Sequence, residues 1–476
     1  MYPLGLGSSL CSGEVEISQD GHHVGPVQYR ACRDWTWGII CLTPFFMWQL
    51  YTIYLLVQLH ESAKTGMRYN RYFHLCRATF GDKIAYWLLL FPIIDLSSGT
   101  CVNLTIIGGS TLNMFVQMCE AIGISRPLKT VEWYLVFTCG TVVLSLIPNL
   151  NSLARVSLID AISSVSYCTI QWVVSVKEGR LSNILHDPSV QASTKISRIL
   201  GVVNAFGFIA LPFRGHNLIL EIQTTMPSSA KNPSQVPMWK GVKSAYLLIA
   251  MCLFPLAIRG YWAYGNVIPK QGGMLIALYM FHRHETSELV LGLTSVLLIL
   301  SVVSSLQLYR KPIFNGLESI YTSRMKQPCP WWFRAISRVI FGFFCFFSAI
   351  TISFYGSQLQ VLSGGFSLPL TLALPCFMWI KIKKPEAYGP MWWFNWTLGL
   401  FGMALGGILI VAGVYVVIVT GIEFLASVAD AANCCGSCRL LIIRIESNRF
   451  IWEDSIVLNL KEAKFQLLLV VGLENN

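Results

Sequence analysis

The chain has 476 residues, of which 54% are hydrophobic and only 12% are charged. Soluble domains average roughly 45–50% apolar and about 25% charged residues, so this composition excludes a soluble globular domain, a disordered chain and a coiled coil. The formal net charge of +11 is spread over the connections between apolar segments and forms no basic stripe, so we expect no nucleic-acid partner.

Ten apolar segments of spanning length can be marked in chain order between Trp35 and Gly421. Because each bilayer crossing needs about 20 apolar residues, they predict an all-α polytopic membrane protein embedded in a lipid bilayer. Residues 1–34 and 423–476 are predicted to be an aqueous tail and a soluble or interfacial tail. The segments cover 36–58, 84–117, 132–150, 153–176, 197–222, 241–263, 288–309, 335–353, 357–380 and 392–420.

The placement of charge predicts the orientation of the chain. Of the lysines and arginines that lie in connections between segments, most follow the first, third, fifth, seventh and ninth segments. By the positive-inside rule these connections face the cytosol, which places both tails outside.

Signatures of a membrane enzyme are not found. The sequence contains no H-E-x-x-H, no G-x-x-x-x-G-K-[ST] and no G-x-S-x-G, which are motifs of zinc hydrolases, nucleotide-binding loops and serine hydrolases. Cys435 and Cys438 form one C-x-x-C, but a metal site needs a second half. We therefore expect neither an enzyme nor a metal or organic cofactor.

The fifth segment is the most informative part of the chain. Pro212 removes a backbone hydrogen-bond donor and Gly215 weakens a helix, so an unbroken spanning helix is not expected. Ionisable side chains at membrane depth cost roughly 2.5–3.5 kcal/mol each unless they face protein or a wet cavity. The polar side chains in this stretch are Arg214, His216, Asn217 and Glu221.

Two interpretations of the fifth segment remain open. One is a proline kink whose polar side chains satisfy the freed backbone groups. The other, which we favour, is a discontinuous helix whose exposed backbone groups and half-helix dipoles form a midplane site for a zwitterion or an ion. The candidate substrate-binding residues here are Phe213, Arg214, Gly215, His216 and Asn217.

Small and hydroxyl residues at other points in the apolar segments are further candidates for substrate binding. They more often allow helices to pack closely, which is also our interpretation of the G-x-x-x-G pattern at Gly402 and Gly406. These candidates are Ser97, Ser98 and Gly99 in the second segment, and Ser304 and Ser305 in the seventh.

Several blocks between about residues 34 and 422 resemble the plant amino acid permeases of the lysine/histidine transporter-like kind. The longest is FRGHNLILEIQTTMPSSAKNPSQVPMWKGVKSAYLLIAMCLFPLAIRGYWAYGNVIP at 213–269. WTWGIICLT, PNLNSLARVSLI, TSRMKQPCPWW and PCFMWIKIKKP carry the same resemblance. It implies that residues 35–422 form an amino acid transporter transmembrane domain of the amino acid/auxin permease family.

The resemblance also implies a fold and a mechanism. The fold is the leucine-transporter type, in which ten of eleven helices form two inverted five-helix repeats. The activity is proton-coupled amino acid symport into the cell across the plasma membrane, with the proton as coupling ion and no protein partner indicated. The break at Pro212 to Asn217 then falls in one of two unwound helices that hold the substrate. His216 and Glu221 are candidates for the coupling proton, with a hydrogen-bonded structural role as the alternative for each.

Three features depart from the family pattern. A first helix rich in small residues should precede Trp35, but after Gly13 the chain leaves the pattern until Asp34, so we predict that this helix is missing or degraded. A transport-incompetent family member, such as a scaffold, a sensor or the product of a faulty gene model, is therefore the alternative function. The tail after Ile422 also departs. Asp95, Asp160 and Arg259 stand where uncharged residues are expected, so we interpret them as unselected substitutions rather than as proton relays.

Overall fold

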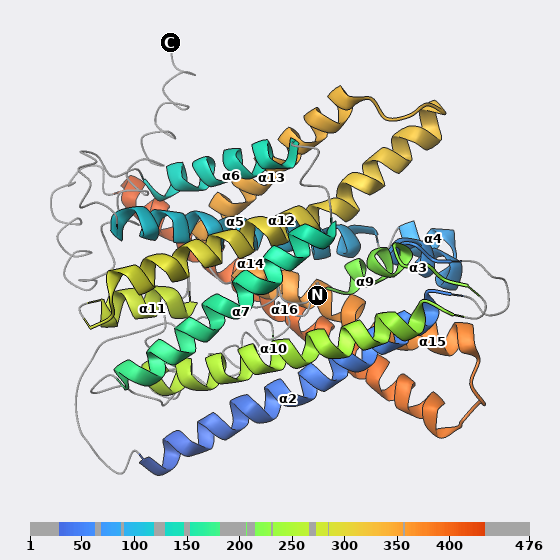
Figure 1. Ribbon diagram of the computed structural model, residues 1–476, viewed down its shortest axis with the longest axis horizontal. Coiled ribbons are helices and arrows are strands. Elements are labelled where there is room, and N and C mark those ends of the chain that lie inside the picture. The colour runs from blue at the N-terminus through green and yellow to red at the C-terminus, as the bar shows by residue number, and fades with distance from the viewer. Residues whose placement is uncertain are drawn as a thin grey trace.

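The computed structural model describes residues 28–61, 68–86, 90–118, 129–146, 153–180, 206, 215–229, 232–265, 273–283, 285–355 and 358–433. Within these ranges the secondary structure is helical apart from one isolated β-bridge between Glu61 and Arg68. The long helices lie alongside and across one another in a single bundle (Figure 1). The prediction of an all-α protein is confirmed.

The bundle contains helices of very different length. A π-helical turn, η8 (Pro369–Ala373), joins α14 to α15. The helices are α2 (Gln28–Leu59), α3 (Tyr72–Phe80), α4 (Asp82–Ile84), α5 (Leu90–Met118), α6 (Thr130–Leu146), α7 (Leu153–Glu178), α9 (His216–Thr224), α10 (Gln235–Tyr264), α11 (Gly273–His282), α12 (Glu288–Met325), α13 (Trp331–Tyr355), α14 (Gln358–Leu368), α15 (Leu374–Lys383) and α16 (Pro390–Asn433).

Seven of the described helical stretches are long and apolar enough to cross a membrane, and α6 and α11 are shorter apolar helices. The 26 residues of α7 are also of spanning length, but this helix is too polar to be counted among the seven. It packs against α12 and α10, and its buried polar side chains include Ser157, Asp160, Ser164 and Gln171. The protein is therefore a multi-pass membrane protein.

Each predicted segment except the fifth coincides with a described helix, or with the row α14–η8–α15. The prediction missed α3 and α11 and ended the seventh segment near residue 309, whereas α12 continues to Met325. This end of α12 is amphipathic rather than apolar: Phe314 and Tyr321, seven residues apart, contact Phe341 and Phe333 of α13. A search for apolar runs does not detect such a helix.

The predicted tails overlap the outermost helices. α2 begins at Gln28, inside the range expected to be an aqueous tail, and α16 continues to Asn433, past the end of the last apolar segment. The remainder of both tails, and with it the prediction of a missing first helix, lies outside the described residues.

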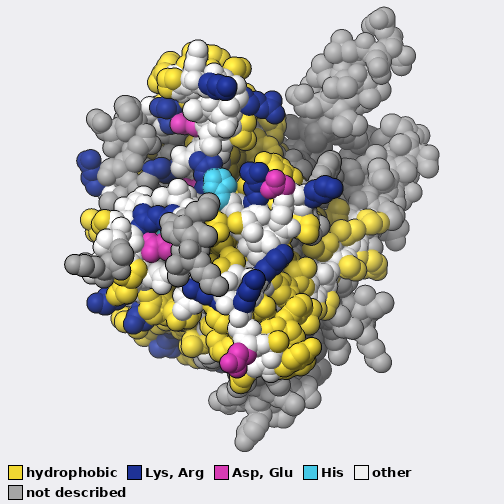
Figure 2. Space-filling model, turned by 90° about the vertical axis from the view of Figure 1, so that its right-hand side faces the viewer, with side chains coloured by type: hydrophobic (Ala, Val, Ile, Leu, Met, Phe, Trp, Pro, Cys, Tyr) yellow, Lys and Arg dark blue, Asp and Glu magenta, His cyan; other side chains and the backbone are white. Residues whose placement is uncertain are grey.

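The basic connections lie together at one end of the bundle. Arg71, before α3, donates a hydrogen bond to the backbone oxygen of Asn315 near the end of α12 at 2.9 Å. The Lys381 ammonium of α15 lies 5.6 Å from the centre of the Phe80 ring of α3. Figure 2 shows Lys and Arg side chains distributed over this face, which is the right-hand side of Figure 1. The described parts of the first, fifth, seventh and ninth connections, which are predicted to be cytosolic, therefore share one side. The orientation itself stays a prediction.

Glycines bring α16 close to the row formed by α14, η8 and α15. A Cβ atom added at Gly406 would lie 2.6 Å from the Pro369 ring and 3.0 Å from the backbone oxygen of Gly365. At Gly402 it would lie 3.3 Å from Ala373 and Trp48. Only glycine permits this approach, so the packing role predicted for the G-x-x-x-G pattern is confirmed.

We expect Gly406→Ala to lower the melting temperature of the purified protein in detergent. The added methyl group would push α16 away from Pro369, and overpacking of this kind costs typically about 1–3 kcal/mol. Gly407→Ala is the matched control, because a Cβ atom at Gly407 meets nothing within 4 Å. Equal melting temperatures for the two variants would contradict the close packing.

Candidate substrate site

α9 begins at His216, within the stretch from Pro212 to Asn217 in which the sequence predicts a helix break. Residues 207–214, which include Phe213 and Arg214, lie outside the described residues, and Gly215 forms the turn that precedes the helix. α9 has only nine residues, and most of its side chains are buried. Because a helix this short is marginal by itself, its position depends on contacts with its neighbours.

His216 joins the start of α9 to α2 through both nitrogens of its ring. The amide nitrogen of Gln49 lies 3.1 Å from Nδ1, and the Thr52 hydroxyl lies 3.0 Å from Nε2. The Thr52 hydroxyl donates its proton to the backbone oxygen of Gln49, so it accepts the Nε2–H of the imidazole. A neutral imidazole satisfies both contacts, which supports the structural alternative for His216.

Asn217 joins the next position of α9 to α5. Its amide nitrogen donates a hydrogen bond to the Ser97 hydroxyl, so the structure brings these two candidates together. The neighbouring Ser98 instead donates to the backbone oxygen of Ile94 in its own helix at 2.8 Å, and Gly99 is half-buried beside it in α5. The amide oxygen of Asn217 is buried without a hydrogen-bond partner among the described residues.

The two serine candidates of α12 lie in a different contact. Ser304 and Ser305 are buried, and the Ser305 hydroxyl donates to Asp160 of α7 at 3.0 Å. Ser305 therefore faces α7. The hydrogen bond also shows that Asp160, interpreted from the sequence as an unselected substitution, has specific partners in the folded protein.

Glu221 lies one turn before the end of α9 and faces α12. Its carboxylate accepts a hydrogen bond of 3.5 Å from the side chain of Asn315. Arg71 and Lys311 are close enough to attract this carboxylate. Glu221 thus belongs to the group of charged residues at the basic end of the bundle.

A second set of hydrogen bonds holds the end of α9 to α2. The amide nitrogen of Gln223 donates to the backbone oxygen of Val57 at 3.2 Å and to the Ser234 hydroxyl at 3.1 Å. Ser234 in turn donates to Glu61 at 2.7 Å, and the Arg68 guanidinium forms an ion pair of 2.9 Å with the same carboxylate. α9 is therefore fixed to α2 at both of its ends.

Sequence reasoning missed these partners on α2. Gln49 and Thr52 are three residues apart in an otherwise apolar run, and Glu61 follows shortly after the end of the same segment. Residues three apart lie on one face of a helix, so polar residues at this spacing within the first segment were the signal available.

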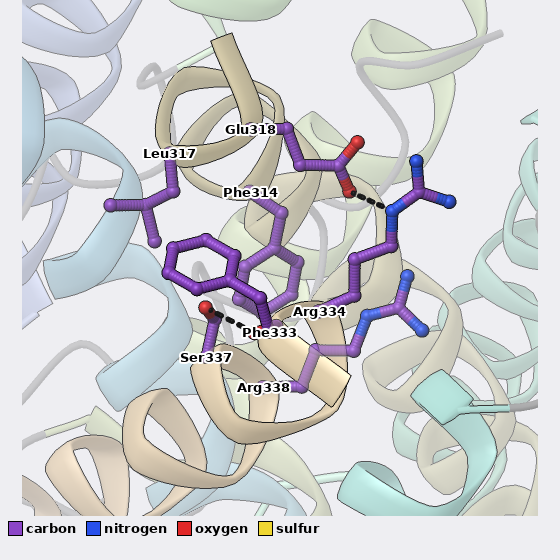
Figure 3. Close-up of a pocket in the computed structure, with 7 residues that line it drawn as sticks. All are labelled: Phe314, Leu317, Glu318, Phe333, Arg334, Ser337 and Arg338. Carbon is purple, nitrogen blue, oxygen red and sulfur yellow. Dashed lines mark hydrogen bonds and ion pairs between the residues drawn. The ribbon is translucent and has the colours of Figure 1, made fainter. Parts of the chain in front are cut away.

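A pocket at the turn between α12 and α13 is separate from these contacts (Figure 3). Arg334 forms an ion pair of 3.3 Å with Glu318 there, and Ser337 donates to the backbone oxygen of Phe333. None of its lining residues is one of the predicted substrate-site residues. It is lined by Phe314, Leu317, Glu318, Phe333, Arg334, Ser337 and Arg338.

Comparisons with known proteins cover most of the chain. Residues 35–419 match the model of a family described as transmembrane amino acid transporter protein. Lysine histidine transporter-like 8 of Arabidopsis thaliana is 48% identical over 84% of this chain and 76% of that protein, and lysine histidine transporter-like 7 of the same plant is 40% identical over 80% and 79%. A solved Na⁺-coupled sialic acid symporter, substrate-bound and outward-open, is 12% identical with a TM-score of 0.47, covering 88% of this chain and 89% of that one.

We expect His216→Ala to destabilise the protein by about 1–3 kcal/mol, because it leaves Gln49 and Thr52 buried without their partner. Thr52→Val keeps the shape of the side chain, so we expect it to destabilise the protein less. The double variant should be destabilised by less than the sum of the two single variants. Thermal unfolding in detergent measures these effects, with His74→Ala at an exposed position of α3 as control. A structural role also predicts that the pH dependence of residual transport does not change in His216→Ala, and a shifted profile would contradict it.

The Glu61 contacts predict a dependence of stability on pH. Burial alone would raise the pKa of Glu61, but hydrogen bonds from Ser234, Ser228 and Arg68 and the positive charge of Arg68 lower it. A carboxylate with a lowered pKa stabilises the folded state above its ordinary pKa of 4.5, and this stability is lost as the pH falls through the folded pKa.

We therefore expect Glu61→Gln to lower the melting temperature modestly at pH 7, because a partly exposed ion pair is screened by solvent. The difference from the unmodified protein should shrink as the pH falls below about 4.5. Glu386→Gln, at an exposed position between α15 and α16, is the control. A difference that stays constant with pH would mean that the Glu61 charge does not stabilise the fold.

Proposed function

Because this chain belongs to the transmembrane amino acid transporter family, we propose that it is a secondary active transporter that moves amino acids into the cell together with protons. The family match carries this proposal, since it covers residues 35–419. The relatives named as lysine histidine transporter-like proteins support amino acids as the substrate class. They do not favour a transport-incompetent scaffold or sensor.

The proposed substrate site lies at the start of α9. The carboxylate of an amino acid would bind near the positive end of the half-helix, beside Gly215 and the preceding residues Phe213 and Arg214. The buried amide oxygen of Asn217, which has no partner among the described residues, would accept a hydrogen bond from the substrate ammonium group. Ser97 of α5, which is hydrogen-bonded to Asn217, would line the same side of the proposed site.

The wider setting follows from the same proposal. We place the protein in the plasma membrane with its basic end in the cytosol, and its helices in two inverted repeats of the leucine-transporter type. Transport of this kind needs no metal or organic cofactor, because the gradient of the coupling ion supplies the free energy. The proton is that ion.

Uptake by purified protein in liposomes tests the proposed function. We expect radiolabelled neutral and basic amino acids to enter several-fold faster under an inward proton gradient than without one, and a protonophore to remove the difference. Asn217→Ala should raise the substrate concentration at half-maximal uptake roughly tenfold, as loss of a buried hydrogen bond worth about 1.4 kcal/mol requires. Asn113→Ala, at a half-buried position on α5, is the matched control. Equal uptake rates with and without the proton gradient would contradict proton coupling.

A further inference from the structure

One carboxyl group lies in the middle of the helix bundle, away from the start of α9. Asp160 of α7 is fully buried. One of its oxygens accepts hydrogen bonds from the hydroxyls of Ser301 at 2.7 Å and Ser164 at 3.5 Å, and the other accepts from Ser305 at 3.0 Å. The Ser164 and Ser301 hydroxyls also lie 2.7 Å apart. Four side chains from two helices thus form a closed polar cluster, which we call the Asp160 cluster.

The neighbours of this carboxyl group are uncharged. A buried carboxylate is costly unless a cation neutralises it or it takes up a proton. Among the described residues Asp160 forms no ion pair, and hydroxyl hydrogen bonds are its only specific partners. Arg310 of α12, the nearest cation along that helix, donates instead to Thr141 of α6 at 3.1 Å. The other ionisable groups on the neighbouring turns and on the adjacent helix α10 are Arg155, Tyr167 and Cys168 on α7, Tyr309 on α12, and Tyr246 and Cys252 on α10. His282 of α11 is hydrogen-bonded to Tyr264, close to the other end of α7.

Serine hydroxyls suit a carboxyl group that changes its protonation state. Each hydroxyl can donate one hydrogen bond and accept two. When Asp160 is ionised, the hydroxyls of Ser301 and Ser305 donate to it, as in this structure. When Asp160 is protonated, its own O–H can donate to one of these hydroxyls after that hydroxyl rotates. The cluster therefore satisfies both states, whereas a guanidinium partner would hold the ionised state alone.

The cluster lies at the contact between α7 and α12. Ser301 and Ser305 are one turn apart near the middle of α12, and Asn315, which contacts Glu221 of α9, lies about 15 Å further along the same helix at 1.5 Å per residue. α12 therefore connects the Asp160 cluster with the helix of the substrate site. Because Asp160 is completely buried, exchange of its proton with the solution requires a path through the packed helices.

We propose that Asp160 is the group that binds the coupling proton, held by Ser164, Ser301 and Ser305. This inference rests on the proposed function and names the site of its coupling ion. The carboxylate takes one proton from the outer solution, becomes a neutral carboxylic acid during the crossing, and releases the same proton to the cytosol. His216 is held as a neutral imidazole by Gln49 and Thr52, and Glu221 has Arg71 and Lys311 nearby, so among these three candidate groups Asp160 is the carboxyl group that is held by hydroxyls alone.

Transport by Asp160→Asn in liposomes tests the assignment. The amide has the shape of the carboxylic acid but cannot release a proton, so we expect exchange of labelled for unlabelled amino acid to remain within about threefold of the unmodified protein. Accumulation driven by an inward proton gradient should fall at least tenfold. Asp95→Asn is the matched control, a second carboxyl group in an apolar helix that is bonded to a serine, Ser363, and it should retain driven accumulation.

The outcomes separate the two levels of the proposal. If the proton gradient does not change amino acid accumulation by the unmodified protein, the proposed coupling is wrong. If the unmodified protein responds and Asp160→Asn accumulates substrate equally well, the coupling stands and the assignment to Asp160 is overturned. Accumulation driven by a Na⁺ gradient and abolished in Asp160→Asn would also overturn it, because the cluster would then bind a metal ion.

A second variant keeps the assignment testable if Asp160→Asn does not fold. Replacing Ser301 and Ser305 with alanine removes two donors that favour the ionised carboxylate, so proton binding becomes tighter. We expect the pH of half-maximal driven uptake to rise by about one unit or more. Ser295→Ala, a buried serine of α12 that donates within its own helix, is the control. An unchanged pH profile in the double variant would overturn the assignment.

Discussion

The hydrogen bonds between α9 and α2 are the interaction on which the candidate site depends. α9 has nine residues and cannot hold its own position, because a helix of this length is unstable alone and cannot span a bilayer. His216 fixes its first turn to Gln49 and Thr52, and Gln223 fixes its last turn to Val57. The start of the helix is thereby presented to α5, where Asn217 meets Ser97. Inside a membrane no water competes for these groups, so each lost bond leaves a buried polar atom unsatisfied.

The same constraint explains the polarity of α7 and α12. Both carry buried serines, and α7 carries a buried carboxyl group that would be expelled from lipid. Packed against each other, the two helices satisfy these groups with their own side chains. The contact between α7 and α12 is thus polar and specific. The packing of the outer helix α16 depends instead on glycines that allow close approach of the backbones. The bundle therefore combines polar and apolar contacts between helices. Only the polar contact between α7 and α12 can change with protonation.

Sequence reasoning found most helices because spanning segments must be apolar, and the ten marked runs follow that requirement. It missed α3 and the end of α12, since these helices pack one face on protein and leave another face polar. It singled out Asn217 and Ser97, which meet, but could not show that the two lie opposite each other. The hydrogen-bond partners of Asp160 could not be predicted for a related reason. The role of a charged residue in an apolar run depends on the hydrogen-bond partners that the neighbouring helix supplies. Ser301 and Ser305 can be recognised as partners of Asp160 only when α12 is known to pack against α7.

The length of α12 has a mechanical consequence. Its 38 residues extend about 57 Å, nearly twice the thickness of the hydrocarbon core, so its basic end projects from the membrane. The rings of Tyr321 and Phe333 pack against each other across the turn to α13, and Glu318 is paired with Arg334, which joins the two projecting ends in one hairpin. A helix that tilts near its middle carries its tip with it, and Pro312, between the middle and the tip, is a point where α12 can bend. A small tilt at the level of Ser301 and Ser305 therefore becomes a displacement of several ångströms at the hairpin tip, where a pair of spectroscopic labels would report each stage of the transport cycle.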